Sequence, residues 1–146
     1  MNDAFERFAL LVGSDAASRV ACSHVTVVGL GGVGGQATEA LARCGVGALT
    51  LIDGDIVQRS NINRQIVADT RTLGRLKAEA MAERLLNINP DLAVRAVARY
   101  VTPETVDAFL NEPTDYVVDA IDDMNAKIAL ITACRERGIP IVSSAG

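Results

Sequence analysis

A glycine-rich hexapeptide, Gly29-Leu30-Gly31-Gly32-Val33-Gly34, stands between an apolar run and a helix-like pattern. Glycines in this context permit a tight turn and close backbone approach to a phosphate, while the following helix directs free N–H groups at the anion. Asp53 ends the next apolar run, 24 residues after Gly29, where a carboxylate can accept hydrogen bonds from ribose hydroxyls. These five residues are candidate nucleotide-binding residues: Gly29, Gly31, Gly32, Gly34 and Asp53. Glycines that only permit close strand–helix packing would give the same pattern.

A cluster of hydroxyl, amide and guanidinium groups follows this aspartate. It comprises Ser60, Asn61, Asn63, Arg64 and Gln65, and Lys77 comes 12 residues after Gln65. An enzyme that cleaves ATP between its α- and β-phosphates must stabilise the charge on the leaving pyrophosphate, and fixed cations do so. A hydride-transferring enzyme has no evident use for these cations, because its cofactor stays intact. The cluster therefore favours ATP cleavage, although Arg64 or Lys77 alone would be equally typical of an ordinary surface.

Carboxylates gather at the end of a fourth apolar run, in the sequence Asp119-Ala120-Ile121-Asp122-Asp123. The carboxyl ends of the strands form the edge of an open α/β sheet at which ligands bind. Hard oxygen ligands there suit Mg²⁺ that bridges phosphate oxygens. Asp122 is the first candidate for the metal ligand, whereas Asp123 is at least as typical of an N-cap for the helix that follows.

Five apolar, β-branched runs must position these groups, and they alternate with helix-like patterns. The predicted strands are 24–29, 48–53, 92–98, 116–120 and 139–143, and the predicted helices are 33–44, 74–89, 102–110 and 123–138. Such alternation is typical of βαβ units, so we expect a Rossmann-like, doubly wound α/β fold with a mainly parallel sheet and helices on both faces. Thr102 before Pro103 predicts the start of the third helix. The polar segment 54–73 is longer than most loops in such folds, which is typical of functional loops.

The composition indicates one compact domain over residues 1–146, since 49% of the residues are hydrophobic and 3% are aromatic. No apolar run approaches the roughly 18 residues that a membrane span needs, and the amino terminus lacks a basic leader. We therefore expect a cytoplasmic protein without membrane contact. The three cysteines, Cys22, Cys44 and Cys134, are far apart in the sequence, and we expect buried thiols.

The charge distribution is uneven along the chain. The net charge of −4 gives no general attraction to nucleic acid. Residues 58–78, however, carry five basic residues against the single acid Asp69. This segment is therefore a candidate for holding a polyanion, with a solvated basic face as the alternative.

Taken as a set, these motifs resemble those of the ubiquitin-activating-like adenylyltransferases, which include members in molybdopterin and thiamine biosynthesis. The resemblance is carried by the glycine pattern at 29–34, the aspartates 53 and 55, the run 60–65, the lysine at 77 and the aspartates 119 and 122. It extends over residues 5–146. Within the superfamily, the runs 63–66, 77–84 and 88–90, together with Lys127, are most similar to the tRNA threonylcarbamoyladenosine dehydratase branch.

The resemblance implies roles for individual residues. Gly32 would touch phosphate, Asp53 would hold the ribose, and Asp122 would direct Mg²⁺. Asn61, Arg64 and Lys77 would surround the triphosphate of ATP, in a site that also contains Asp55, Ser60, Asn63 and Gln65. The run 5–13 resembles a segment whose arginine reaches across a homodimer into the partner's ATP site, which makes Arg7 the candidate, although Ala4 replaces the usual first arginine.

For the dehydratase branch, the resemblance implies that a carboxylate on a modified tRNA adenosine attacks the α-phosphate of ATP. Pyrophosphate leaves, and the resulting acyl-adenylate then closes on itself with loss of AMP. Other branches would instead adenylate the carboxy-terminal glycine of a small sulfur-carrier protein. An NAD-dependent oxidoreductase and a non-catalytic partner-binding subunit are further alternatives. Family members continue beyond the fifth strand, so we expect the carboxy-terminal substrate part to be absent here and this chain alone to be inactive.

Overall fold

The computed structural model describes residues 3–144, so residues 1–2 and 145–146 of the expected domain lie outside the described part. The elements in chain order are η1 (Asp3–Phe5), α1 (Glu6–Val12), α2 (Ser14–Ala21), β1 (His24–Val28), α3 (Gly32–Arg43), β2 (Ala48–Ile52), η2 (Arg59–Asn61), α4 (Lys77–Ile88), β3 (Ala93–Val97), α5 (Val106–Phe109), β4 (Tyr116–Asp119), α6 (Met124–Glu136) and β5 (Ile141–Ser143). Strands thus alternate with helices after α2, as the sequence predicts.

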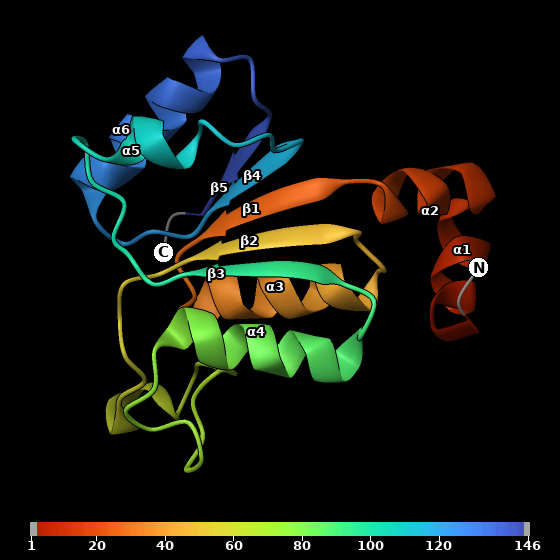
Figure 1. Cartoon of the computed structure of the whole chain (residues 1–146), viewed down its shortest axis with the longest axis horizontal. Coiled ribbons are helices and arrows are strands. Elements are labelled where there is room, and N and C mark those ends of the chain that lie inside the picture. The colour runs from red at the N-terminus through yellow and green to blue at the C-terminus, as the bar shows by residue number, and fades with distance from the viewer. Residues whose placement is uncertain (1–2, 145–146) are drawn as a thin grey trace.

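Five parallel strands form one sheet in the order β3-β2-β1-β4-β5 (Figure 1). The chain builds β1, β2 and β3 toward one edge and then returns past β1 to add β4 and β5. Val28 at the end of β1 lies opposite Ile52 of β2 and Asp119 of β4, so these three strands end level with one another. Ligands of open α/β sheets bind where the strand order reverses, which here is the crevice at the carboxyl ends of β1 and β4.

Helices cover both faces of the sheet (Figure 1), which confirms the doubly wound α/β prediction. On one face, Val27 and Leu51 belong to the same core as residues of α3 and α4. On the other face, Val28, Ile52 and Val117 pack with residues of α5 and α6. Successive side chains of β1 and β2 therefore enter different cores, as the pleat of a strand requires.

Two predicted helix starts are wrong. Helix α4 begins at Lys77 rather than at residue 74, because Gly74 has a φ of 80° and Leu76 is extended. Helix α5 covers only Val106–Phe109, and its N-cap is Thr105 rather than Thr102. The Thr102 N–H instead donates to Thr105 Oγ1 at 2.9 Å, in the turn that precedes the helix.

The cysteine prediction holds only for Cys134, which is buried. Cys44 is half-buried and Cys22 is exposed, because each follows the last turn of a helix, α3 and α2 respectively, and neither reaches the sheet core. Among the described residues, no helix combines the length and apolar character that a membrane crossing requires.

Candidate functional site

The glycine-rich turn joins β1 to α3 with little space for side chains. Gly29 has a φ of 92°, and a Cβ there would lie 2.6 Å from the Ala120 carbonyl oxygen. A Cβ on Gly34 would lie 1.7 Å from the Gly29 carbonyl oxygen. Helix α3 starts at Gly32 without a side-chain cap, so its first N–H groups are directed out of the turn. Gly29 and Gly34 are therefore required for packing, and the same packing creates an anion-binding helix end.

Asp53 connects the end of β2 to this turn. Its Oδ2 accepts a hydrogen bond of 2.7 Å from the Leu30 N–H, and its Oδ1 accepts one of 2.7 Å from the Asp55 N–H. Each carboxylate oxygen has a second lone pair, so a ribose hydroxyl can still donate to Asp53. The carboxylate thus orders the glycine turn as well as facing the position expected for a ribose.

The long segment 54–76 is closed at its base by backbone hydrogen bonds. Val57 N–H donates to the Arg75 carbonyl at 2.8 Å, and Gly74 N–H donates to the Val57 carbonyl at 2.9 Å. Lys77 N–H donates to the Asp55 carbonyl at 3.0 Å. This closure places Lys77, the first residue of α4, beside Asp55, three residues after the end of β2. The Lys77 Nζ lies 3.5 Å from Asp55 Oδ2, and the Lys77 side chain is only 6% exposed.

The polar cluster 60–65 folds around the 3-10 helix η2. Arg64 Nη1 donates to the Ser60 carbonyl at 3.0 Å and to Asn63 Oδ1 at 2.8 Å, so these two residues hold the guanidinium. Asn61 Oδ1 accepts from the Gln58 N–H at 2.8 Å. Gln65 Oε1 is the one fully buried side-chain oxygen or nitrogen in residues 3–144 without a hydrogen-bond partner. A buried unpaired amide oxygen is costly, which points to a ligand or water at this position.

At the end of β4, Asp119 is fully buried in an ion pair. Lys127 Nζ of α6 lies 2.6 Å from Asp119 Oδ2 and also donates to the Ser144 carbonyl at 2.8 Å. Asp119 Oδ1 accepts from the Ile121 N–H at 3.0 Å, which fixes the turn that leads to Asp122. Asp123 accepts from the Ala126 N–H at 2.8 Å, so its alternative role as the N-cap of α6 is confirmed.

A cavity of about 370 Å³ gathers most of the predicted site. Its lining includes Gly29, Gly31, Asp53, Asp55, Asn61, Arg64, Gln65, Lys77 and Asp122. The volume lies within the range of about 300–1,000 Å³ that is typical of small-molecule sites. Four predicted residues do not line the cavity but lie next to residues that do. Gly32 and Gly34 belong to the glycine turn, and Ser60 and Asn63 accept hydrogen bonds from Arg64.

Sequence reasoning missed one wall of this cavity, which is formed by Arg99, Tyr100 and Val101 after β3. The wall also borders a larger groove of about 740 Å³ that runs between residues 100–104 and α6 and contains none of the predicted site residues. The only available signal was that this stretch follows a strand, and a parallel sheet places the ends of its strands at one edge.

Arg7 is the predicted residue that lies far from the cavity. Helix α1 packs beside the segments that precede β2 and β3, since Phe5 and Phe8 share a hollow with residues 44–47 and 89–91. These segments are at the amino ends of the strands, opposite the site (Figure 1). Within one chain, Arg7 therefore does not join the other site residues.

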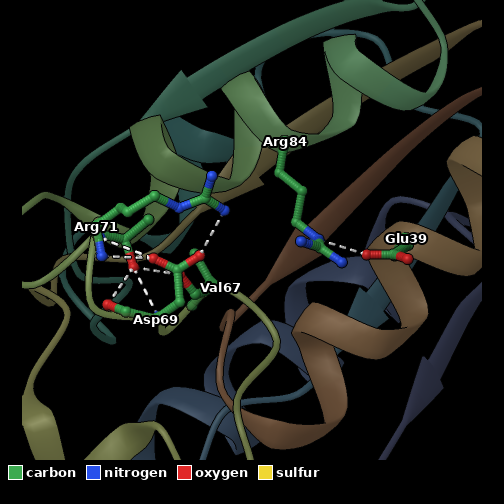
Figure 2. A network of polar contacts seen from close by, with 6 residues as sticks. Glu39, Val67, Asp69, Arg71 and Arg84 are labelled. Carbon is green, nitrogen blue, oxygen red and sulfur yellow. Dashed lines mark hydrogen bonds and ion pairs between the residues drawn. The ribbon is translucent and has the colours of Figure 1, made fainter.

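Acids neutralise part of the basic segment 58–78. Figure 2 shows Arg71 turned toward Asp69, whose carboxylate lies 3.1 Å from its guanidinium. The Arg71 hydrogen bonds lower the pKa of Asp69 below its usual value. Arg75 likewise pairs with Glu83 at 2.5 Å. Of the five basic residues, Arg64 and Lys77 are the ones that line the cavity, together with the aspartates 53, 55, 122 and 123.

The model of the ThiF family matches residues 5–146, which is nearly the whole chain. The chain belongs to the ThiF family. This ThiF domain is 49% identical over 138 residues to the tRNA threonylcarbamoyladenosine dehydratase of Escherichia coli (strain K12), a match that covers 94% of this chain and 52% of that protein. It is 42% identical over 142 residues to the protein of the same name from Bacillus subtilis (strain 168), over 97% of this chain and 56% of that protein.

The fold agrees with a solved relative. The E. coli tRNA N6-threonylcarbamoyladenosine dehydratase, in complex with ATP, matches the ThiF domain with a TM-score of 0.95 and 48% identity. That match covers 97% of this chain and 58% of the solved one. The chain therefore spans a little over half the length of these relatives.

Proposed function

We propose that this ThiF domain binds ATP and adenylates a carboxylate, as part of a tRNA threonylcarbamoyladenosine dehydratase. The observation that carries the proposal is the convergence of Arg64, Lys77 and a helix N-terminus on one cavity, next to the ribose candidate Asp53. The free N–H groups are suited to the phosphates of either ATP or a dinucleotide, whereas two fixed cations are suited to a leaving pyrophosphate, which a cofactor that stays intact does not release. The high identity to two dehydratases supports the choice of reaction.

In this proposal the tRNA side-group carboxylate attacks the α-phosphate of ATP. The α–β bridging bond breaks, and Arg64 and Lys77 stabilise the pyrophosphate that leaves. A nucleophilic atom of the same side group then attacks the acyl carbon of the adenylate. The bond between that carbon and the AMP oxygen breaks, so the ring closes and AMP is released. No protein nucleophile is needed, because an intramolecular attack on an activated acyl group is already favoured by proximity.

Asp122 is the proposed ligand of Mg²⁺. Its exposed carboxylate lines the cavity and accepts no hydrogen bond or ion pair from residues 3–144. Those residues also contain no cluster of three metal-ligating side chains. Both features fit the usual protein mode for this ion, in which one or two carboxylates hold it together with substrate phosphates and water. Bound Mg²⁺ would neutralise charge on the phosphates.

The proposal includes a cytoplasmic homodimer with tRNA as substrate. The exposed apolar side chains of α1 support a second copy as partner, since Leu10 is 76% exposed and Leu11 82% exposed. Their helix also carries Arg7, the candidate for a contribution to the partner's site.

The first test compares nucleotides by thermal unfolding of this chain. A ligand that binds only the folded state stabilises it by about 2.7 kcal/mol at 100 times its Kd. We expect a larger rise in Tm with Mg-ATP than with NAD at equal concentration. An equal or larger rise with NAD would overturn the proposal in favour of an oxidoreductase, and no rise with either would favour a non-catalytic subunit.

A further inference from the structure

Tyr100 occupies an unusual position at the wall of the nucleotide cavity. Its ring lies directly against the Gly54 backbone, because a Cβ on Gly54 would come within 2.6 Å of the ring atom Cδ2. Tyr100 is 61% exposed and lines both the 370 Å³ cavity and the 740 Å³ groove. Tyr100 is therefore a surface aromatic residue whose ring occupies the space that a side chain at position 54 would fill.

The Tyr100 hydroxyl donates a short hydrogen bond to Asp55 Oδ1. The other oxygen of the same carboxylate, Oδ2, faces Lys77 Nζ at 3.5 Å. Three side chains from three separate segments thus form a line, from the end of β3 through the end of β2 to the start of α4. The hydrogen bond to Asp55 raises the pKa of the Tyr100 phenol.

The distance from Asp55 to Lys77 is the informative feature. A charge-assisted N–H···O hydrogen bond is normally about 2.7–2.9 Å long, so Lys77 and Asp55 form an ion pair whose 3.5 Å separation is longer than a direct hydrogen bond. The Lys77 ammonium donates no hydrogen bond to residues 3–144, although its side chain is almost fully buried. A carboxylate that already accepts from a phenol is fixed in orientation and is a weaker acceptor for a second donor.

We propose that Tyr100 is a positioning residue, whose hydroxyl holds Asp55 so that Lys77 stays available for the triphosphate. The inference rests on the proposed function, because it takes Lys77 as a phosphate contact. Without the phenol, Asp55 rotates until its ion pair with Lys77 shortens to a direct hydrogen bond, and the carboxylate then competes with the phosphates. The ring itself serves only to carry the hydroxyl to this point.

The test compares ATP with AMP, since Lys77 is placed beside the leaving pyrophosphate, which AMP lacks. Dissociation constants are measured by calorimetry with this chain. Tyr100→Phe should weaken ATP binding on the order of five- to tenfold, the scale of one hydrogen bond, and leave AMP binding unchanged. Gly54→Ala should act in the same direction, because the new methyl group displaces the ring. In an Asp55→Asn background, the effect of Tyr100→Phe should disappear, since a neutral amide does not trap Lys77.

Tyr116→Phe is the matched control. The chain has two tyrosines, and Tyr116 lies at the start of β4, with no hydrogen bond from its hydroxyl to residues 3–144. This change should leave both nucleotide affinities unaltered. It also leaves Tyr100 as the sole phenol, so that phenolate absorbance reports on Tyr100 alone. In this background, Asp55→Asn should lower the titration midpoint of the remaining phenol.

Three results would overturn the inference. The first is an unchanged affinity for both ATP and AMP in Tyr100→Phe. The second is a loss that persists in the Asp55→Asn background, which would exclude a path through Asp55. The third is an equal loss for both nucleotides, which would indicate a packing role for the ring. If the parent chain binds neither ATP nor AMP, the proposed function falls and the inference with it.

Discussion

At the scale of single residues, Lys77 and Arg64 are exposed to opposite degrees and yet have the same expected task. Lys77 is 94% hidden at the start of a helix, whereas Arg64 is an exposed side chain held by a carbonyl and an amide oxygen. Both are fixed before any ligand arrives, and fixed charges stabilise a leaving group without reorganisation. The burial of Lys77 is a cost to folding that its position in the cavity explains.

We expect Lys77→Ala and Arg64→Ala each to slow pyrophosphate release in the full-length protein on the order of 10²-fold, the usual cost of losing a preorganised charge partner. Release is measured with tRNA that carries threonylcarbamoyladenosine. Arg59→Ala is the control, because Arg59 is an exposed arginine of the same segment that does not line the cavity. Normal turnover by both variants would refute the phosphate assignment, and turnover with a sulfur-carrier protein in place of tRNA would redirect the substrate assignment.

Single residues could be predicted from the sequence where their position depends on neighbouring residues in the chain, and not where it depends on distant contacts. The glycine turn, Asp53 and the N-cap Asp123 were predictable because each follows from backbone geometry within a few positions. Tyr100 was not predictable, since its contact with Asp55 joins residues 45 positions apart. The unpaired Gln65 oxygen was likewise invisible, because burial of one amide atom depends on the packing of the whole loop.

At the scale of elements, α3 and α4 are connected by one carboxylate. Glu39 of α3 pairs with Arg84 of α4 at 2.6 Å (Figure 2). It also pairs with Arg43 of its own helix at 2.9 Å. The hydrogen bond from Arg84, followed by that from Arg43, lowers the pKa of Glu39 below the ordinary 4.5. The two helices that flank the glycine turn and Lys77 are thus held together by an ionised glutamate.

This pair gives stability that depends on pH. A carboxyl group with a lower pKa in the folded state stabilises the fold above its unfolded pKa, and this contribution is lost as the pH falls through the folded pKa. We expect Glu39→Gln to lower the free energy of unfolding by about 1 kcal/mol at pH 7, and we expect this difference to shrink as the pH is lowered from 7 through the folded-state pKa of Glu39. Urea unfolding across this pH range measures the difference. Glu104→Gln, at an exposed site without an ion pair in residues 3–144, should show no such trend.

Elements were predicted more reliably in the middle of the chain than at its start. All five strands were predicted from their apolar, β-branched runs. Burial between two helix layers explains these runs in the inner strands β1 and β2, whereas the edge strands β3 and β5 contain no buried residue. Helices α1 and α2 were missed because they pack outside the sheet and contain no buried residue. The start of α5 was missed because a threonine cap and a proline are equally compatible with a turn.

At the scale of the whole molecule, the site and α1 lie at opposite ends of the sheet (Figure 1). A five-residue strand spans about 17 Å, which an arginine side chain cannot bridge. Arg7 therefore has no route to the cavity of its own chain. In a twofold-symmetric dimer, by contrast, a helix at one end of a subunit can face the opposite end of its partner. Arg7 consequently either contributes to the ATP site of the partner subunit or has no role in an ATP site.

Mixing two inactive variants of the full-length protein decides whether Arg7 acts in the partner's site. An Arg7→Ala subunit retains Lys77, and a Lys77→Ala subunit retains Arg7, so one site of each mixed dimer has both residues if Arg7 acts across the interface. Random exchange makes about half of the dimers mixed, and about a quarter of the wild-type activity should return. Pyrophosphate release is measured after subunit exchange, which differently tagged subunits confirm independently. If Arg7 acted within its own chain, every site would still lack one residue. Confirmed exchange without recovered activity would therefore exclude the role in the partner's site.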